Sequence, residues 1–290
     1  MAVCANRARG HDAGLSRFSG VAKTGRVSDQ ARAGASENAG PNYWRDDKCA
    51  KAFWSQQELP PYRQLLADTI ALAAPRPGER WLDLGCGGGR LTRGIWEESG
   101  GAVAAITGLD VAAVNEEAYA MLRATLTPPP GERITFAVQD FSSGLPTVAS
   151  GSLDGVVSGL SIQYAESFAE GRWTDAAYDR LLREVLRVLR PGGRFVFSCN
   201  VPNPSWMRIG IGSLSSVFAA RQTLRFLKQA QRMMRYGAWL KREARKGRFH
   251  YLPAEQVLGK LAAAGFRETA HRQSYGGQAF IFSGSKPLNG

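Results

Sequence analysis

Residues 80–199 alternate between short apolar segments and helical segments, and this alternation is the feature that most constrains the fold. Five apolar segments have the length and composition of strands, and helical sequence separates them. These segments are Trp81–Leu84, Val103–Leu109, Ile134–Val138, Leu153–Leu160 and Arg194–Cys199. Strands that alternate with helices predict a mostly parallel sheet covered by helices on both faces.

The carboxyl-terminal residues add two expected strands. Phe266–Gln273 and Gln278–Ser283 lie on either side of Tyr275-Gly276-Gly277, which predicts a hairpin. Pro191-Gly192-Gly193 predicts a turn before the fifth strand. The expected helices are Tyr62–Ala74, Val114–Thr125, Trp173–Leu189 and Pro253–Ala264, with another from the glycines at 85–89 to about Ser99. The fold class is therefore α/β, with a seven-stranded, mostly parallel sheet.

Changes in composition predict how the chain is divided. Residues 1–40 are rich in Ala, Gly, Arg and Ser, which predicts a disordered extension. Residues 41–79 contain aromatic residues and a helix, and we interpret them as an N-terminal helical cap. Residues 80–204 and 248–290 would form the main domain. A basic helical insertion, residues 205–247, follows the fifth strand and is interpreted as a lid.

A glycine-rich turn after the first expected strand predicts a nucleotide-binding site. The sequence Asp83-Leu84-Gly85-Cys86-Gly87-Gly88-Gly89 can bend sharply and leave room for a ligand against its backbone. The following helix offers exposed N–H groups. Asp110 ends the second strand, where a carboxylate can accept hydrogen bonds from ribose hydroxyls. Asp140 ends the third strand, next to the place that an adenine would occupy.

The charge at this turn favours S-adenosylmethionine over NAD. A dinucleotide fingerprint would need a glycine at position 90, which is Arg90, and a P-loop would need a Gly-Lys-Ser/Thr ending. An acid at position 83 would repel a pyrophosphate, but it suits the cationic amino group of a methionine moiety. We therefore expect S-adenosylmethionine as the cofactor.

These motifs resemble those of the class I S-adenosylmethionine-dependent methyltransferases, in the broad small-molecule group similar to the ubiquinone/menaquinone-biosynthesis type. The resemblance covers about residues 60–200 and, more loosely, 248–285. The resemblance implies a Rossmann-like fold and in-line methyl transfer. It also implies residues that bind the methionine end, the ribose and the adenine of the cofactor and that border its sulfonium. The implied cofactor-binding residues are Asp83, Gly85, Cys86, Gly87, Gly89, Asp110, Val111, Asp140, Phe141 and Ser158.

Candidates for the acceptor side are Tyr164, His250 and Tyr251. Core packing explains an aromatic or a histidine at these places equally well. Similar proteins place a histidine before the aromatic residue, where this chain has Gln163, so that loop supplies no obvious general base. The aromatic residues Tyr43, Trp44, Phe53 and Trp54 predict either a cover over the cofactor or core packing.

The net charge of +12 is concentrated in one block, since residues 201–250 hold 11 of the 37 Lys and Arg residues and a single acid, Glu243. Apolar residues interleave with these charges, which is typical of amphipathic helices. Three interpretations stay open. The block is a lid with a solvated basic face, a surface that touches anionic lipid near a lipophilic acceptor, or a contact surface for phosphate or RNA.

The expected function is methyl transfer to a small-molecule acceptor, lipophilic or anionic. The alternatives are an RNA methyltransferase, although the sequence has no Asn-Pro-Pro-Tyr-like tetrad or appended RNA-binding module, and a non-catalytic cofactor-binding scaffold. The four scattered cysteines and three histidines predict no metal site. They indicate reduced thiols and a cytoplasmic location. The sequence does not specify the oligomeric state.

Overall fold

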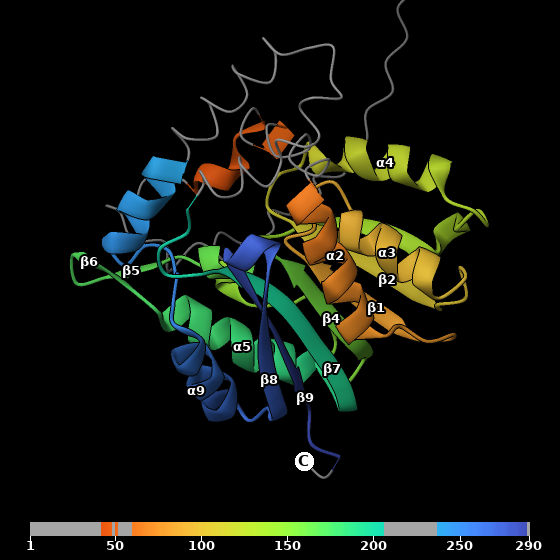
Figure 1. The fold of residues 1–290 in the computed structure, drawn as a ribbon. Coiled ribbons are helices and arrows are strands. Elements are labelled where there is room, and N and C mark those ends of the chain that lie inside the picture. Colours follow the sequence, from red (N-terminus) through yellow and green to blue (C-terminus); the bar gives the residue numbers. More distant parts are fainter. Residues whose placement is uncertain (1–41, 48–49, 52–59, 206–236, 289–290) are drawn as a thin grey trace, which may run out of the picture. The chain divides into compact units, whose positions relative to one another are not determined.

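A seven-stranded sheet forms the centre of the fold, with the strand order β3-β2-β1-β4-β7-β9-β8 (Figure 1). The computed structural model describes residues 42–47, 50–51, 60–205 and 237–288. Strands β3, β2, β1, β4 and β7 pair in parallel, whereas β9 runs antiparallel to both of its neighbours. The strands are β1 Arg80–Leu84, β2 Ala105–Asp110, β3 Ile134–Val138, β4 Leu153–Gly159, β7 Leu189–Asn200, β8 Arg267–Ser274 and β9 Ala279–Ser285.

Helices cover both faces of this sheet because each carries a continuous apolar stripe. On one face, α2 (Pro60–Ala73), α3 (Arg90–Glu98) and α4 (Asn115–Thr125) pack around the fully buried Trp81 and Trp96. On the other face, α5 (Ala176–Val188) and α9 (Ala254–Ala264) pack against β4, β7 and β9. The prediction of a seven-stranded, mostly parallel sheet with helices on both faces is confirmed.

Local differences from the sequence predictions lie next to α5 and β7. The helix expected over residues 173–189 begins only at Ala176, because Ser167–Ala169 (β5) and Arg172–Thr174 (β6) form a short antiparallel hairpin instead. The turn expected at Pro191-Gly192-Gly193 is part of β7. The extra residues of β7 are accommodated because its pairing with β4 shifts register between Leu153 and Gly155.

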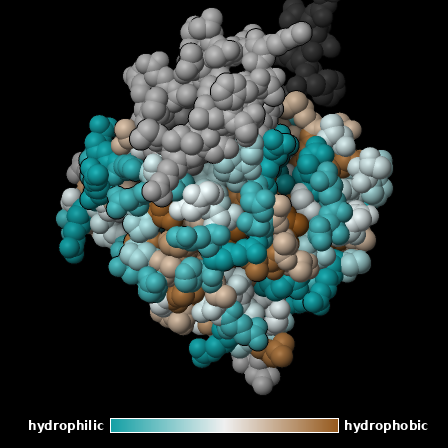
Figure 2. All heavy atoms as spheres, in the orientation of Figure 1, coloured by the Kyte–Doolittle hydropathy of each residue, from teal (hydrophilic) through white to brown (hydrophobic). Residues whose placement is uncertain are grey.

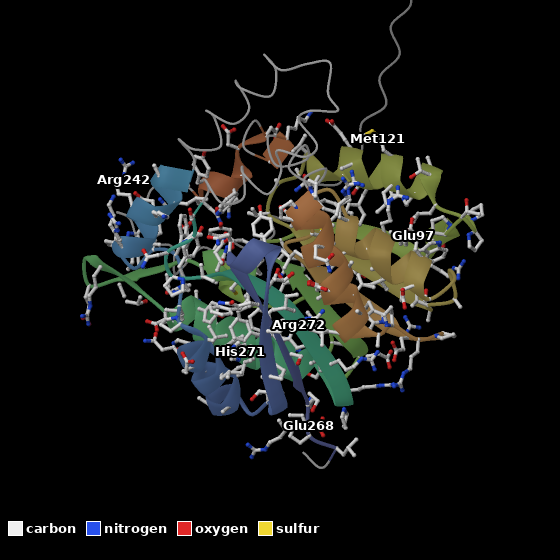
Figure 3. All side chains as sticks on the ribbon, viewed as in Figure 1. Glu97, Met121, Arg242, Glu268, His271 and Arg272 are labelled. Atoms are coloured by element: carbon white, nitrogen blue, oxygen red, sulfur yellow. The ribbon has the colours of Figure 1, made fainter. Side chains whose placement is uncertain are left out.

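Several sequence predictions fall outside the described residues. These are the disorder of residues 1–40 and the residues Phe53 and Trp54, together with residues 206–236 of the expected lid. The described end of that insertion, residues 237–245, is helical. Leu240 of this helix is buried while Arg242 is exposed and points outward (Figure 3), which is the amphipathic arrangement that the sequence predicted.

Two short segments pack on one another through aromatic rings. The first is the 3-10 helix η2 (Tyr43–Arg45), and the second contains residues 237–251. The ring centroids of Tyr43 and Trp239 are 4.3 Å apart, and those of Trp239 and Phe249 are 5.6 Å apart. Segments from opposite ends of the chain therefore share one aromatic cluster.

The edge strand β8 pairs with β9 and also contacts α9 and α2. His271 packs against Phe280 and Phe282, and the Arg272 guanidinium donates to the carbonyl oxygen of Asp68 (Figure 3). The face shown in Figure 2 mixes hydrophilic residues with scattered hydrophobic ones. Among the described residues, no helix has both the length and the apolar composition that a bilayer-spanning helix needs.

Candidate functional site

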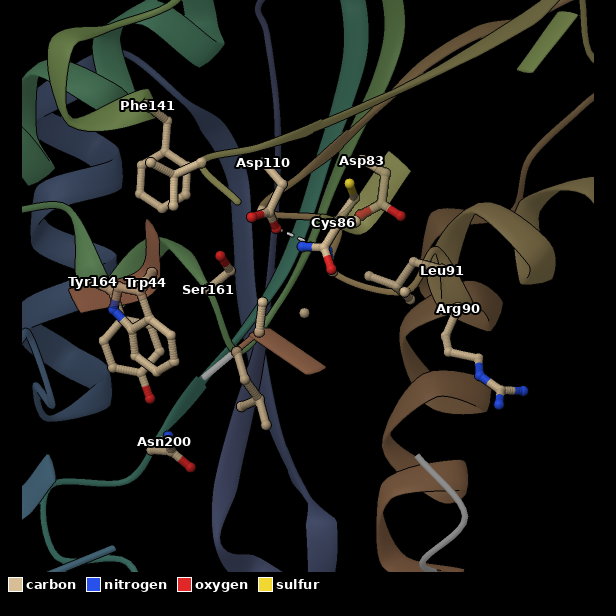
Figure 4. A pocket seen from close by; sticks show the side chains of 18 of the residues that line it. Trp44, Asp83, Cys86, Arg90, Leu91, Asp110, Phe141, Ser161, Tyr164 and Asn200 are labelled. Atoms are coloured by element: carbon tan, nitrogen blue, oxygen red, sulfur yellow. Dashed lines mark hydrogen bonds between the residues drawn. The ribbon is translucent and has the colours of Figure 1, made fainter. Parts of the chain in front are cut away.

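A pocket lies at the carboxyl ends of β1, β2, β4 and β7, the edge where open α/β sheets bind ligands (Figure 4). Its lining divides into two parts. The loop half contains Asp83, Gly85, Cys86, Gly87, Gly88, Asp110, Val111, Asp140 and Phe141. The aromatic half contains Trp44, Tyr62, Leu66, Leu160, Tyr164, Asn200, Leu240 and Tyr275.

The glycine-rich turn forms the floor of the loop half. Gly85 has a φ of +66°, and a Cβ there would overlap the Ser161 side chain. The backbone N–H groups of Gly85 and Cys86 donate to the carbonyl oxygen of Leu109 at 2.7 and 3.1 Å, which fastens the turn to β2. A Cβ on Gly87, whose φ is +48°, would meet no described atom within 4 Å. The turn is therefore fixed from below and open above Gly87.

Asp110 is held rigidly at the end of β2. Its Oδ2 accepts a hydrogen bond from the Gly87 N–H at 2.9 Å, and its Oδ1 accepts one from the Ala112 N–H at 2.9 Å (Figure 4). Burial raises the pKa of this carboxyl, and hydrogen bonds from the Ala112 and Gly87 backbones and from the Asn115 side chain oppose that rise. Asp110 lines the pocket at the end of a strand, where a carboxylate can accept hydrogen bonds from the adjacent hydroxyls of a ribose.

Asp83 lies beneath the turn and is 1% exposed. Its Oδ2 accepts from both the backbone N–H and the hydroxyl of Thr92, at 3.0 and 2.8 Å, so Asp83 caps the first turn of α3 from β1. Burial raises the pKa of Asp83 to about 7, against the effect of these hydrogen bonds. A cation bound beside this carboxylate would favour the ionised form.

Asp140 and Phe141 form the far end of the loop half. Oδ1 of Asp140 accepts from the Ser142 N–H at 2.9 Å and begins the 3-10 helix η5, Phe141–Ser143. Oδ2 accepts from the Asn42 side-chain amide at 3.0 Å and is 3.4 Å from the Arg45 guanidinium. The residue expected to recognise an adenine therefore also fastens the segment that contains η2.

The structure brings together most of the residues that the sequence predicted for the cofactor. Two of them do not line the pocket. Gly89 is the N-cap of α3, with a φ of +73°. Ser158 is fully buried in β4, where its hydroxyl donates to the carbonyl oxygen of Leu84 at 2.7 Å. Gly89 and Ser158 therefore support the glycine-rich turn without facing the pocket.

The three candidates for the acceptor side separate into one lining residue and two supporting residues. Tyr164 lines the pocket and stacks on Trp44, with ring centroids 4.5 Å apart. Its hydroxyl is 3.0 Å from that of Tyr251, which stands behind it. His250 does not line the pocket. It is 5% exposed, and its Nε2 lies 2.8 Å from the carbonyl oxygen of Ala165. Burial lowers the pKa of His250, so it is a neutral, packed residue.

The aromatic half also contains residues that sequence reasoning missed as site residues. Tyr62 lies in the first turn of α2, Tyr275 follows β8, and their ring centroids are 6.1 Å apart. Asn200 is the last residue of β7. Each lies next to an element that the sequence predicted, but only the tertiary arrangement turns these side chains towards one pocket.

Gln163 replaces the expected histidine and has a structural role. The side chain is completely buried. Its Oε1 accepts from the Asn200 backbone N–H at 2.7 Å, and its Nε2 donates to the carbonyl oxygen of Leu160 at 3.2 Å. One end of this amide joins β7 to the loop after β4, and the other end fixes the conformation of that loop.

Comparison with known proteins agrees with this arrangement. Residues 82–197 match the sequence model of a family described as methyltransferase domain. No curated relative matches the sequence. One similar solved structure is a chain of the complex between the Haloferax volcanii Trm112 methyltransferase activator and a candidate methyltransferase. It is 17% identical with a TM-score of 0.57, over 84% of this chain and 97% of that one.

Another similar structure is Haemonchus contortus phosphoethanolamine N-methyltransferase 2, solved with phosphomonomethylethanolamine and S-adenosylhomocysteine. It is 17% identical with a TM-score of 0.52, over 83% of this chain and 57% of that one. At this level of identity the two likenesses establish the fold.

The residues of the loop half fit S-adenosylmethionine. The open space above Gly87 admits a ligand against the backbone, Asp110 presents a carboxylate at the place of a ribose, and Asp83 provides a buried carboxylate for an ammonium group. Residues 82–197, which match the methyltransferase-domain model, therefore carry a pocket whose residues suit this cofactor. The closer similarity to the ubiquinone/menaquinone type remains a prediction.

Proposed function

We propose that this methyltransferase transfers the methyl group of S-adenosylmethionine to a small molecule that binds in the aromatic half of the pocket. One observation carries the proposal: a single pocket is lined both by the glycine-rich turn and by the side chains of Trp44, Tyr62, Tyr164 and Tyr275. Aromatic walls of this kind bury flat, largely apolar ligands well.

The protein contributes binding and orientation in this proposal. The cofactor supplies a methyl group that its sulfonium already activates. Asp83 would neutralise the ammonium group, Asp110 would hold the ribose, and Phe141 would contact the adenine. The Trp44–Tyr164 wall would keep water away from the acceptor and fix its approach.

Proton transfer to the tyrosines of the aromatic half is unfavourable near neutral pH. Burial raises the pKa of Tyr62 and of Tyr164 to about 12 in each case, so both hydroxyls keep their protons. They can orient an acceptor, but they do not serve as its general base. The acceptor would therefore be a group that is nucleophilic without help, such as an anion or a free amine.

The basic sequence between residues 206 and 236 lies outside the described residues, so its contact with anionic lipid stays a prediction, as does the cytoplasmic location. A contact with lipid would bring the protein close to a lipophilic acceptor, and the apolar aromatic half of the pocket is compatible with such an acceptor.

The decisive experiment has two steps. Calorimetric titration with S-adenosylhomocysteine, with NAD as the control, first tests the loop half. Incubation with methyl-labelled S-adenosylmethionine and either a metabolite extract or total RNA then tests the acceptor. Labelled metabolites support the proposal, and labelled RNA overturns it in favour of an RNA methyltransferase. Cofactor binding without labelling in either fraction would indicate a non-catalytic scaffold.

A further inference from the structure

The aromatic half contains a buried oxygen atom that accepts no hydrogen bond from the described part of the chain. This atom is Oδ1 of Asn200. Asn200 ends β7, is 2% exposed and lines the pocket. A buried carbonyl oxygen without a donor carries a desolvation cost, and proteins keep such atoms mainly where something else binds them.

The rest of Asn200 is fixed by neighbouring groups. Its backbone N–H donates to Oε1 of Gln163 at 2.7 Å, and its side chain lies beside Tyr251, whose hydroxyl is 3.0 Å from that of Tyr164. In Figure 4 the oxygen of Asn200 points away from Tyr164. Asn200 is therefore held by its backbone beside the pocket, and the described residues leave its side-chain oxygen without a hydrogen-bond donor.

We propose, on the basis of the function proposed above, that Asn200 orients the methyl acceptor by accepting a hydrogen bond from it at Oδ1. The acceptor is then a largely apolar, ring-containing molecule that carries a hydroxyl or N–H group. Asn200 is a positioning and specificity residue in this proposal, since an amide oxygen does not take up a proton at neutral pH.

The chemistry of the surrounding wall supports this class of acceptor. Trp44, Tyr164 and Tyr275 offer ring faces and edges, and Leu160 and Leu240 add aliphatic surface. In such a setting a single polar atom discriminates strongly, because a ligand without a donor leaves the oxygen buried and unpaired. An anionic group placed against Oδ1 would be repelled by the carbonyl dipole.

Three fluorinated probes of nearly equal size test the proposal. The protein is first saturated with S-adenosylhomocysteine, so that the loop half is filled. Dissociation constants of 4-fluorophenol, 4-fluoroaniline and 4-fluoroanisole are then measured by fluorine NMR. We expect 4-fluorophenol or 4-fluoroaniline to bind at least about tenfold more tightly than 4-fluoroanisole, which has no donor. Preference for the phenol indicates that the group held by Asn200 is a hydroxyl, and preference for the aniline indicates that it is an N–H group.

Variants at and near Asn200 assign the effect to its oxygen. Asn200→Leu keeps the side-chain size and should abolish the preference for donors. Asn200→Asp keeps an acceptor oxygen and should retain the preference. Asn203→Leu makes the same change at an exposed position that does not line the pocket and should behave like the wild type.

The outcomes separate this inference from the proposed function. Equal binding of the three probes to the loaded wild type overturns the inference, and so does a donor preference that survives Asn200→Leu. Failure of the wild type to bind S-adenosylhomocysteine removes the proposed function itself. If Asn200→Leu does not fold, the wild type and Asn200→Asp still decide, because both must prefer donors over 4-fluoroanisole.

Discussion

The two halves of the pocket are built in different ways. The loop half comes from the ends of three neighbouring strands and the turns that follow them, and backbone N–H groups hold its acids in place. The aromatic half comes from α2, β7, the loops after β4 and β8, and the two packed segments around Tyr43 and Trp239. The comparison teaches that local backbone geometry builds most of the proposed cofactor site, whereas the proposed acceptor site needs side chains from distant parts of the chain.

Replacing Asp110 gives the largest expected effect and tests whether the loop half alone binds the cofactor. Asp110→Ala removes the proposed ribose acceptor and releases the Gly87 N–H, so affinity for S-adenosylhomocysteine should fall about 100-fold by calorimetry. Asp179→Ala is the matched control, since Asp179 pairs with Lys260 on α5 and α9 and does not line the pocket. A loss below about threefold for Asp110→Ala would show that the ribose binds elsewhere.

The pH dependence of cofactor binding tests the electrostatics of the loop half. With its pKa near 7, Asp83 is mostly protonated at pH 6 and mostly ionised at pH 8. A cationic ammonium group binds the ionised form, so affinity for S-adenosylhomocysteine should rise about tenfold from pH 6 to pH 8 and then level off.

Asp83→Asn should bind more weakly and lose this slope. If the slope persists in Asp83→Asn, the proton belongs to another group of the loop half, for which Asp110, whose pKa burial also raises, is the candidate.

A change in the aromatic half should leave cofactor binding intact. Tyr251→Phe removes the hydroxyl pair with Tyr164 and should lower the free energy of unfolding by about 1 kcal/mol, as measured by urea denaturation. Affinity for S-adenosylhomocysteine should stay within about twofold of the wild type. A larger fall in affinity would mean that the two halves are not independent units.

Sequence reasoning predicted the fold and the loop half because both are encoded locally. The alternation of strands and helices determines the sheet, and the order Asp83, Gly85, Gly87 specifies a turn whose backbone conformation requires glycine. Asp110 and Asp140 could be located because each comes directly after a strand, at the edge where ligands bind.

The aromatic half could not be predicted in the same way. Tyr275 belongs to what reads as a hairpin turn, and its place in the pocket depends on how β8 and β9 meet α2. His250 looks like a catalytic candidate next to Tyr251, yet the packing of Tyr178 against its ring buries it. Asn200 has no motif at all. The role proposed for it depends on the tertiary contact of β7 with Gln163 in the loop after β4 and on the burial of its side-chain oxygen.

The short helix η2 touches both halves, because Asn42 at its N-cap binds Asp140 while Trp44 stacks on Tyr164. A ligand in either half that shifts this helix changes the free energy of binding in the other half. Such thermodynamic coupling is reciprocal. The factor by which the cofactor strengthens acceptor binding must therefore equal the factor by which the acceptor strengthens cofactor binding, so a measurement of either affinity with and without the other ligand gives the strength of the link through η2.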